Sequence, residues 1–297
     1  MLAIAFELGM RSVSSDYRRL MMNAYKIGGD HFTNAAEGAM FTYTARKPPY
    51  NIASFDHWHF RRDPINEQHL NISEHGDTDD VLANIDDTLQ HLIMSDSTRP
   101  WCFVFNLKVF LSTICDMHSI FHVTELFTNE FPNGDDNAKN FYVKHNNNFI
   151  SLFDLWETGC GLYPSLDWSQ VNSTVDAIIK EYPTSTYSSS TTFSTTLATE
   201  IIAQTKNLTI EYGYAQLTNG STVNDAYIEK CQQISRKQIS EAGHALAEAF
   251  QRIAIPSFSE YVVSVPSVRQ TEVVAWTIFA FLLPITLVIY FQKFCGN

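Results

Sequence analysis

Histidine and carboxylate side chains gather between residues 57 and 157, and their types are those that bind divalent metal ions. They lie in three short segments, FDHWHF, CDMHSIFH and FDLWETG, as His57, His59, Asp116, His118, His122, Asp154 and Glu157. Imidazole and carboxylate together suit zinc or a similar ion. Asp116 and His122 are six residues apart, so they do not share one face of a helix. Either they serve two neighbouring ions, or the helix that carries Asp116 ends between them.

A helix is predicted near the start of the chain, from residue 16 to about residue 27. Ser14 or Ser15 is suited to cap its first turn, because a hydroxyl oxygen accepts hydrogen bonds from free backbone N–H groups there. Gly28-Gly29 is suited to end it.

Three further helices are predicted from apolar residues that recur at helical spacing. Thr78 or Asp79 caps the first, Pro100 precedes the second, and the third closes the soluble part of the chain. Their apolar stripes are, in order, Val81, Ile85, Leu89 and Leu92; Phe103, Leu107, Phe110, Leu111 and Ile114; and Ala242, Ala245, Leu246, Ala249, Phe250 and Ile253. We find no sustained two-residue alternation, so the predicted class is all-α. The Ser/Thr-rich stretch 183–199 is predicted to be a loop.

The composition indicates a folded protein without a broad basic surface. The chain has 297 residues, of which 45% are apolar, so it can bury a sizeable core. Its net charge of −12 argues against tight binding of duplex DNA through phosphate neutralisation. A nuclease that holds phosphate on metal ions is still compatible with this charge.

The order of several motifs resembles the S1/P1 family of zinc-dependent single-strand nucleases, which are related in fold to bacterial phospholipase C. The resemblance is carried by HWHFRRDPIN, FNLKVFLSTICDMHSIFHV, NGDDNAKNFYV, NNNFISLFDLWETG and SEAGHALAEAFQRI, and it extends from Met1 to about Ile253. It implies an all-helical phospholipase C/nuclease-type domain with three zinc ions in a cleft. It also implies hydrolysis of single-stranded DNA or RNA to 5′-nucleotides.

The resemblance assigns four metal ligands, namely His59, Asp116, His122 and Glu157, with Asp116 as the bridging and catalytic carboxylate. Other ligand positions are altered. Where the family has histidines this chain has Ser112 and Phe153, a family Asp falls near Tyr43 or Thr44, and the family's N-terminal Trp and His would precede Met1. His57 and His118 are the available substitutes.

Two functions follow from this ligand count. The first is a divergent zinc-dependent endonuclease with eroded activity. The second is a catalytically inactive, membrane-anchored glycoprotein that uses the old cleft for binding. Zinc is therefore implied by the family, whereas a full three-ion cluster is not expected, because a catalytic zinc normally has about three protein ligands.

A membrane anchor is predicted at the C-terminus. Residues 273–291 contain no charge over 19 positions, which as a helix spans about 28 Å, close to the thickness of a bilayer core. The predicted layout is a helical domain at 1–255, a stalk at 256–272, the transmembrane helix at 273–291 and a short tail at 292–297.

The segment MLAIAFELGMRSV is a poor signal peptide, which would favour a tail-anchored chain with a cytosolic domain, but four sequons favour a domain in the lumen or outside the cell. N-glycans are predicted at four sequons, Asn71, Asn172, Asn207 and Asn219. Cys102 and Cys115 lie on one predicted helix about 20 Å apart, too far for a disulfide. We predict that any disulfide pairs Cys160 with Cys231.

Overall fold

The computed structural model describes residues 1–72, 80–95, 98–165, 167–183 and 193–258. Met1–Phe258 form one compact unit. The predicted transmembrane helix at 273–291, the tail at 292–297 and most of the stalk lie outside the described residues. Within the described part, no helix is both long and apolar enough to cross a bilayer.

Helices dominate the described chain, as the sequence predicts. The α-helices are α1 (Leu2–Met10), α2 (Ser15–Ile27), α3 (Ala36–Ala39), α4 (Phe41–Ala45), α5 (Val81–Ile93), α6 (Pro100–Met117), α7 (Leu152–Glu157), α8 (Trp168–Glu181), α9 (Thr195–Leu208) and α10 (Asp225–Arg252). Short 3₁₀ segments form η1 (Ala53–Phe55) and η2 (His57–His59), and a π-helical turn, η4 (Thr209–Gly213), extends α9.

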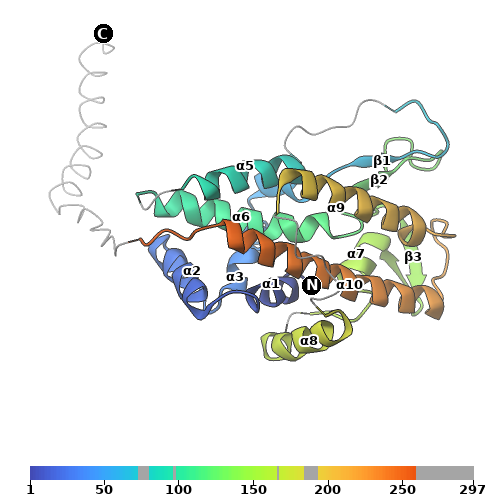
Figure 1. Ribbon diagram of the computed structural model, residues 1–297. Helices are drawn as coiled ribbons and strands as arrows, with labels where there is room; N and C mark the ends of the chain where they lie inside the picture. Colours follow the sequence, from blue (N-terminus) through green and yellow to red (C-terminus); the bar gives the residue numbers. More distant parts are fainter. Residues whose placement is uncertain (73–79, 96–97, 166, 184–192, 259–297) are drawn as a thin grey trace, which may run out of the picture. The chain divides into compact units, whose positions relative to one another are not determined.

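Helix α6 lies at the centre of the core and packs against α5, α9 and α10 (Figure 1). Its apolar stripe from Phe103 to Ile114 is fully buried, and the stripe of α5 and most of the stripe of α10, from Ala245 onward, join the same cluster. Because three separate stripes meet in one core, the last turn of α6 is held firmly. That turn carries Asp116.

Two predicted helix starts have different outcomes. The Ser14 hydroxyl accepts a hydrogen bond from Tyr17 N and caps α2, which confirms that prediction. The cap of α5 is Asp80, whose carboxylate accepts from the backbone N–H groups of Leu82 and Ala83, so the prediction of Thr78 or Asp79 is wrong. Asp80 also pairs with Arg61 at 3.0 Å, a long-range partner that the local sequence does not reveal.

Helix α9 begins inside the stretch predicted to be a loop. Ser194 caps it by accepting from Leu197 N, and its helical residues start at Thr195. Residues 184–192 of that stretch lie outside the described residues. The loop prediction therefore runs too far, because a cluster of Ser and Thr supplies helix caps as readily as turns.

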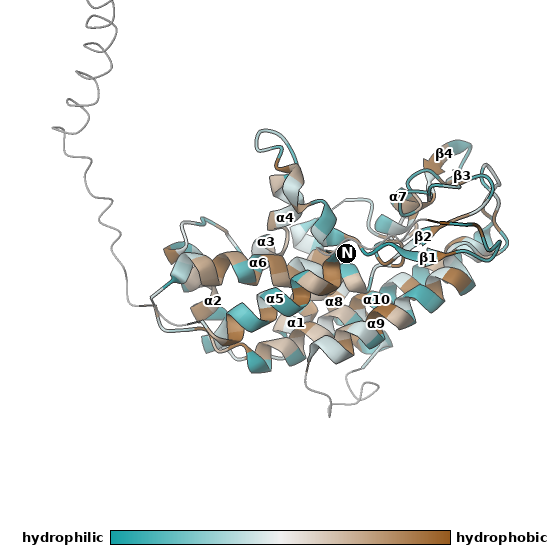
Figure 2. Cartoon of the chain, turned by 90° about the horizontal axis from the view of Figure 1, so that it is seen from above, coloured by the Kyte–Doolittle hydropathy of each residue, from teal (hydrophilic) through white to brown (hydrophobic). Residues whose placement is uncertain are grey.

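Two small sheets depart from the all-α prediction. Strands β1 (Asp63–Ile65) and β2 (Thr124–Leu126) pair in parallel, and β3 (Tyr142–His145) and β4 (Asn148–Ser151) form a hairpin. The turn residues of the hairpin, Asn146 and Asn147, both have positive φ, as a two-residue hairpin turn requires. Strands of three or four residues are too short for alternation to reveal them. With α7 they lie at one end of the molecule and α2 lies at the other (Figure 2).

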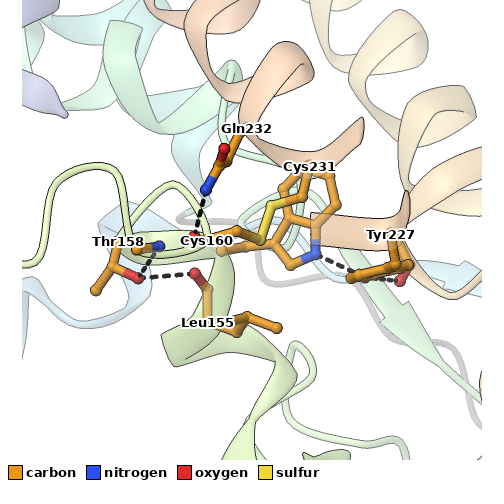
Figure 3. The surroundings of a disulfide bond; sticks show 9 residues. Leu155, Thr158, Cys160, Tyr227, Cys231 and Gln232 are labelled. Atoms are coloured by element: carbon orange, nitrogen blue, oxygen red, sulfur yellow. Dashed lines mark hydrogen bonds between the residues drawn. A yellow bond between two sulfur atoms is a disulfide. The ribbon is translucent and has the colours of Figure 1, made fainter. Parts of the chain in front are cut away.

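The predicted disulfide between Cys160 and Cys231 is present and links the loop after α7 to α10 (Figure 3). Gln232 Nε2 donates to the carbonyl of Cys160 at 3.0 Å. The neighbouring Trp156 Nε1 donates to the Tyr227 hydroxyl at 2.8 Å. These links fix α7, and with it Glu157, against the long closing helix.

Candidate functional site

The four side chains predicted as ligands converge, although different elements carry them. His59 ends η2, Asp116 lies in the last turn of α6, His122 lies in the turn between α6 and β2, and Glu157 ends α7. Helix α6 ends at Met117. Of the two readings of the Asp116–His122 spacing, the one in which the helix ends between them is therefore correct.

Asp116 is 2% exposed, and both of its carboxylate oxygens are engaged. His59 Nδ1 lies 2.7 Å from Oδ2, and the Tyr43 hydroxyl donates to Oδ1. The pKa of Tyr43 is raised well above its ordinary value by burial and by the charges of Asp116 and Glu157, so the phenol stays protonated and donates. His122 Nδ1 lies further from Oδ1, at 3.4 Å.

His122 and Glu157 form a second pair beside Asp116. His122 Nε2 lies 3.1 Å from Glu157 Oε1, which also accepts from the Ser119 hydroxyl at 3.2 Å. Burial opposes both charges, but the neighbouring carboxylates raise the pKa of His122, and His122 lowers the pKa of Glu157. Each group of the pair therefore favours the charged form of the other. His122 Nδ1 lies 2.9 Å from the carbonyl oxygen of His59.

Two phenylalanines enclose the imidazole of His122. The ring of Phe60 stacks on it with 4.7 Å between the ring centroids. The centroid of the Phe153 ring lies 5.4 Å from that of the imidazole, and the planes of these two rings differ by 29°. Phe153 thus lies beside the site, at a position where the resemblance places a ligand, and it supplies only an apolar ring. The ammonium of Lys139 lies 4.1 Å from the Phe60 ring.

Ser112 lies one helical turn before Asp116 and is fully buried. Its hydroxyl donates to the carbonyl of Val109 at 2.9 Å, within its own helix, and it is not among the residues that line the cavity described next. His57 is exposed and does not line that cavity either. Asp154 is also exposed and accepts from the Ser151 hydroxyl at 2.7 Å.

A cavity of about 240 Å³ opens beside these pairs. Its polar lining includes Tyr43, Asp116, Ser119, His122 and Glu157. Apolar side chains from α1, the turn after α6, α7 and α10 also line it, among them Ala3, Ala5, Ile120, Trp156, Ile239 and Ala242. A cavity of this size holds a compact organic molecule and not only one or two waters, each of which occupies about 30 Å³.

Three further polar residues line the same cavity: His118, Ser235 and Gln238. They are 5%, 4% and 7% exposed, and burial lowers the pKa of His118 to about 3. Sequence reasoning noted His118 as a spare ligand and missed the other two. The sequence did contain a signal for these two: Ser235 and Gln238 are polar, lie three residues apart, and share a face of α10 that is otherwise apolar.

The residues present do not fit a zinc cluster. Among the described residues, no three His, Cys, Asp or Glu side chains come together in a way that could hold a metal ion. Asp116 is occupied by Tyr43 and His59, and Ser112 and Phe153 offer no nitrogen. His122 with Glu157 makes a two-ligand position, whereas catalytic zinc sites use about three protein ligands.

Comparison with known families gives one match. The sequence profile described as S1/P1 Nuclease matches residues 8–254, which is most of the chain and nearly all of the compact unit. No curated protein matches the chain.

Proposed function

This chain belongs to the S1/P1 nuclease family, and from that premise we propose that it is a divergent member whose cleft binds a ligand and has largely lost phosphodiester hydrolysis. Nuclease chemistry in the family depends on zinc, so the proposal turns on whether this chain can assemble the ions. A cavity beside Asp116, His122 and Glu157 supports the binding part of the proposal, and the reduced ligand set that the resemblance implies supports the loss of hydrolysis.

The observation that carries the proposal is the hydrogen bond from Tyr43 to Asp116. Asp116 is the carboxylate that the family resemblance assigns to bridging two ions. Here one of its oxygens accepts from a phenol and the other lies 2.7 Å from His59. The resemblance places a ligand Asp near Tyr43 or Thr44, so a hydrogen-bond donor lies close to where the family has an anionic ligand.

A second candidate function is slow hydrolysis on a single ion held by His122 and Glu157. One observation favours it: His122 Nδ1 lies 2.9 Å from the carbonyl oxygen of His59, and metal-binding histidines commonly donate their other ring N–H to such a carbonyl. Two protein ligands are one fewer than a catalytic zinc normally has.

Metal analysis combined with a nuclease assay separates these functions. We expect the purified protein to contain well under one zinc per chain and to leave single-stranded DNA uncut, far below the turnover of about 1 to 1000 per second typical of enzymes. About one zinc with slow, chelator-sensitive cleavage would favour the second candidate. About three zinc ions with rapid cleavage would contradict the proposal.

Restoring the missing ligands tests whether erosion of the site is the cause. The variant Tyr43→Asp/Ser112→His/Phe153→His, on a chain extended at its N-terminus by Trp and His, is expected to gain zinc and to cleave single-stranded DNA orders of magnitude faster. The matched control is Tyr50→Asp in place of Tyr43→Asp, because Tyr50 is 66% exposed. If the restored chain binds zinc without gaining activity, ligand loss is not the explanation.

We further propose that the compact unit lies in the lumen or outside the cell, anchored through residues 273–291. The Cys160–Cys231 disulfide supports this, since disulfides persist mainly in oxidising compartments. Asn71, Asn172 and Asn207 are exposed sequon residues that suit glycosylation. Asn219 suits it less, because its amide accepts from Tyr142 N and donates to Glu130.

A further inference from the structure

Three exposed apolar side chains lie at one end of the compact unit, where α5 ends and α6 begins. Ile93 and Met94 are 44% and 80% exposed, and Trp101 is 65% exposed. The short connection 95–99 joins the two helices, which pack along one another, and their joined ends lie at the same end of the unit as α2 (Figure 1). We call these three residues the apolar tip. Exposed apolar side chains that gather in this way mark surfaces that bind a protein or a membrane.

The ring of Trp101 is held in its exposed position by other aromatic rings. It stacks on Phe105, with 5.6 Å between the ring centroids and 11° between the ring planes. Phe105 in turn contacts the rings of Phe55 and Trp58, at 6.2 Å and 6.3 Å between centroids, and Phe55 is buried. Because this column of rings continues into the interior, Trp101 is presented to the surroundings with little conformational entropy left to lose on binding.

The size and composition of the apolar tip suit a lipid bilayer better than a protein. A stable protein–protein interface takes about 20 to 30 residues from each partner, whereas the tip offers three large apolar side chains. Tryptophan is enriched at the boundary between lipid and water, because its ring is apolar and its N–H is polar. Methionine and isoleucine supply apolar surface that the acyl-chain boundary accepts.

The described chain ends beside the apolar tip. The ring of Phe258, its last residue, lies 5.6 Å from that of Phe103, which follows Trp101 by two residues in α6. Residues 259–272 then lead to the uncharged segment 273–291. At no more than about 3.6 Å per residue, the 14 residues of this connection span at most about 50 Å. An anchor at 273–291 therefore keeps this end of the unit near the membrane, which raises the effective concentration of the tip at the bilayer surface.

The charge around the apolar tip indicates that anionic lipids are not required. From Leu92 to Leu107 the sequence contains one acid, Asp96, and one base, Arg99. Anionic lipids attract clusters of basic residues, and neither this segment nor a chain with a net charge of −12 provides one. The expected contact is therefore apolar and forms on zwitterionic lipid.

We infer that the apolar tip inserts into the interface of the bilayer that holds residues 273–291, so that the protein contacts its membrane at two places. The inference rests on the anchor in the proposed function and goes beyond it, because it assigns a membrane-docking surface to the folded unit. With the tip in the bilayer, the other end of the unit, which carries β3, β4 and α7, faces away from the membrane (Figure 2). Glu157 and the cavity beside it then stay open to the surroundings.

A spin label on Cys102 tests the inference, because this thiol is exposed, free and adjacent to Trp101. Burial raises the pKa of the Cys115 thiol, which therefore reacts slowly. The full chain with Cys295→Ser is labelled with a nitroxide and placed, one chain per disc, in phosphatidylcholine nanodiscs. We expect electron paramagnetic resonance to place the nitroxide about 5–10 Å deep in the lipid interface, as for other interfacial segments, where a water-soluble nickel chelate does not reach it. A matched label on exposed Asn148→Cys, in a Cys102→Ser background, should be accessible to the chelate.

Variants of the apolar tip supply the second readout. Met94→Glu/Trp101→Glu is expected to return the Cys102 label to water, so that its protection from the nickel chelate is lost. The matched control is Tyr142→Glu/Phe149→Glu, which places the same charges on exposed aromatic residues of the hairpin and should leave the label protected. All four side chains are at least 46% exposed, so both variants should keep the fold, which circular dichroism checks.

The outcomes separate this inference from the proposed function. A Cys102 label that is as accessible as the Asn148→Cys label, on a chain that elutes with the discs, overturns the inference and leaves the anchor in place. Protection that persists in Met94→Glu/Trp101→Glu also overturns it, since something other than the tip then covers Cys102. Protection that appears only in discs with two chains, together with spin–spin broadening, would show that a second copy covers the tip. A chain that does not elute with the discs overturns the anchor and the inference together.

Discussion

In the proposed function, Tyr43 is the side chain that closes a metal position while the surrounding fold is kept. Its hydroxyl donates to Asp116, and its ring lies 4.4 Å from that of His59. An ionised, buried carboxylate needs either a cation or hydrogen-bond donors to offset its desolvation. Here the phenol and the imidazole supply those donors, so the site can be stable without a metal ion.

Removing this donor should therefore destabilise the protein. Tyr43→Phe keeps the ring and deletes the hydroxyl, which leaves one oxygen of Asp116 without its donor. We expect the free energy of unfolding to fall by about 1–3 kcal/mol, the usual cost for a hydrogen bond to a charged group. Urea denaturation measures this, with the exposed Tyr50→Phe as the control. An unchanged stability would show that the Tyr43 hydroxyl does not support Asp116.

The acid sensitivity of the protein should depend on His118. In the unfolded chain an imidazole binds a proton near pH 6.5, whereas burial lowers the pKa of His118 to about 3 in the folded protein. As the pH falls below 6.5 the unfolded state binds the extra proton, so stability is lost, with a slope approaching about 1.4 kcal/mol per pH unit.

His118→Gln should flatten the fall in unfolding free energy between pH 6.5 and 4.5. The His122–Glu157 pair acts mainly outside this window. The raised pKa of His122 means that its stabilising effect is lost as the pH rises through that value, and the lowered pKa of Glu157 means that its effect is lost as the pH falls below about 4.5. Exposed His31→Gln serves as the control. An identical slope in His118→Gln would contradict the assignment.

Sequence reasoning located part of this site and missed the rest for a physical reason. Asp116, His122 and Glu157 belong to motifs whose order resembles a known family, so their convergence could be predicted. Their convergence is a separate matter from metal binding, which depends on how many ligands surround each ion. Ser235 and Gln238 belong to no motif, and their role depends on which face α10 turns toward the cavity, which only tertiary packing determines.

At the scale of elements, the sequence predicted a helix or its cap correctly where the interaction that forms it lies within a few residues along the chain. The Ser14 cap and the apolar stripes of α5, α6 and α10 follow from the chain itself. The cap of α5 is Asp80 and not the predicted Thr78 or Asp79, and Asp80 also pairs with the distant Arg61. Strands β1 and β2 escaped prediction because they are three residues long and pair across more than fifty residues of sequence.

The Cys160–Cys231 disulfide should contribute strongly to the stability of the end of the molecule that holds Glu157. It closes a loop of 71 residues, for which chain entropy predicts a stabilisation of about 4 kcal/mol. Cys160→Ser/Cys231→Ser is therefore expected to lower the melting temperature markedly in thermal unfolding. Cys102→Ser, at an exposed free thiol, should leave it unchanged. Equal melting temperatures for the two variants would contradict this expectation.

At the scale of the whole molecule, the acidic charge and the cleft chemistry point in the same direction. A net charge of −12 gives no long-range attraction for nucleic acid. The proposed function requires no such attraction, because it assigns the protein little nuclease activity. A compact unit with a disulfide, exposed sequons and an apolar C-terminal segment is consistent with display on a membrane surface.

The anchor itself is the last prediction. Residues 273–291 are uncharged over 19 positions, and an arginine near the middle of a spanning helix costs about 2.5–3.5 kcal/mol of insertion free energy. We expect the full chain to remain in the membrane pellet after alkaline carbonate extraction. Leu283→Arg/Leu287→Arg and a chain that ends at Phe258 should both be released, whereas Leu283→Ile/Leu287→Ile should stay in the pellet. Carbonate removes proteins held only by surface charge, so retention of the isoleucine variant together with release of the arginine variant would identify insertion of this segment as the cause. Release of the unmodified full chain would exclude it as an anchor.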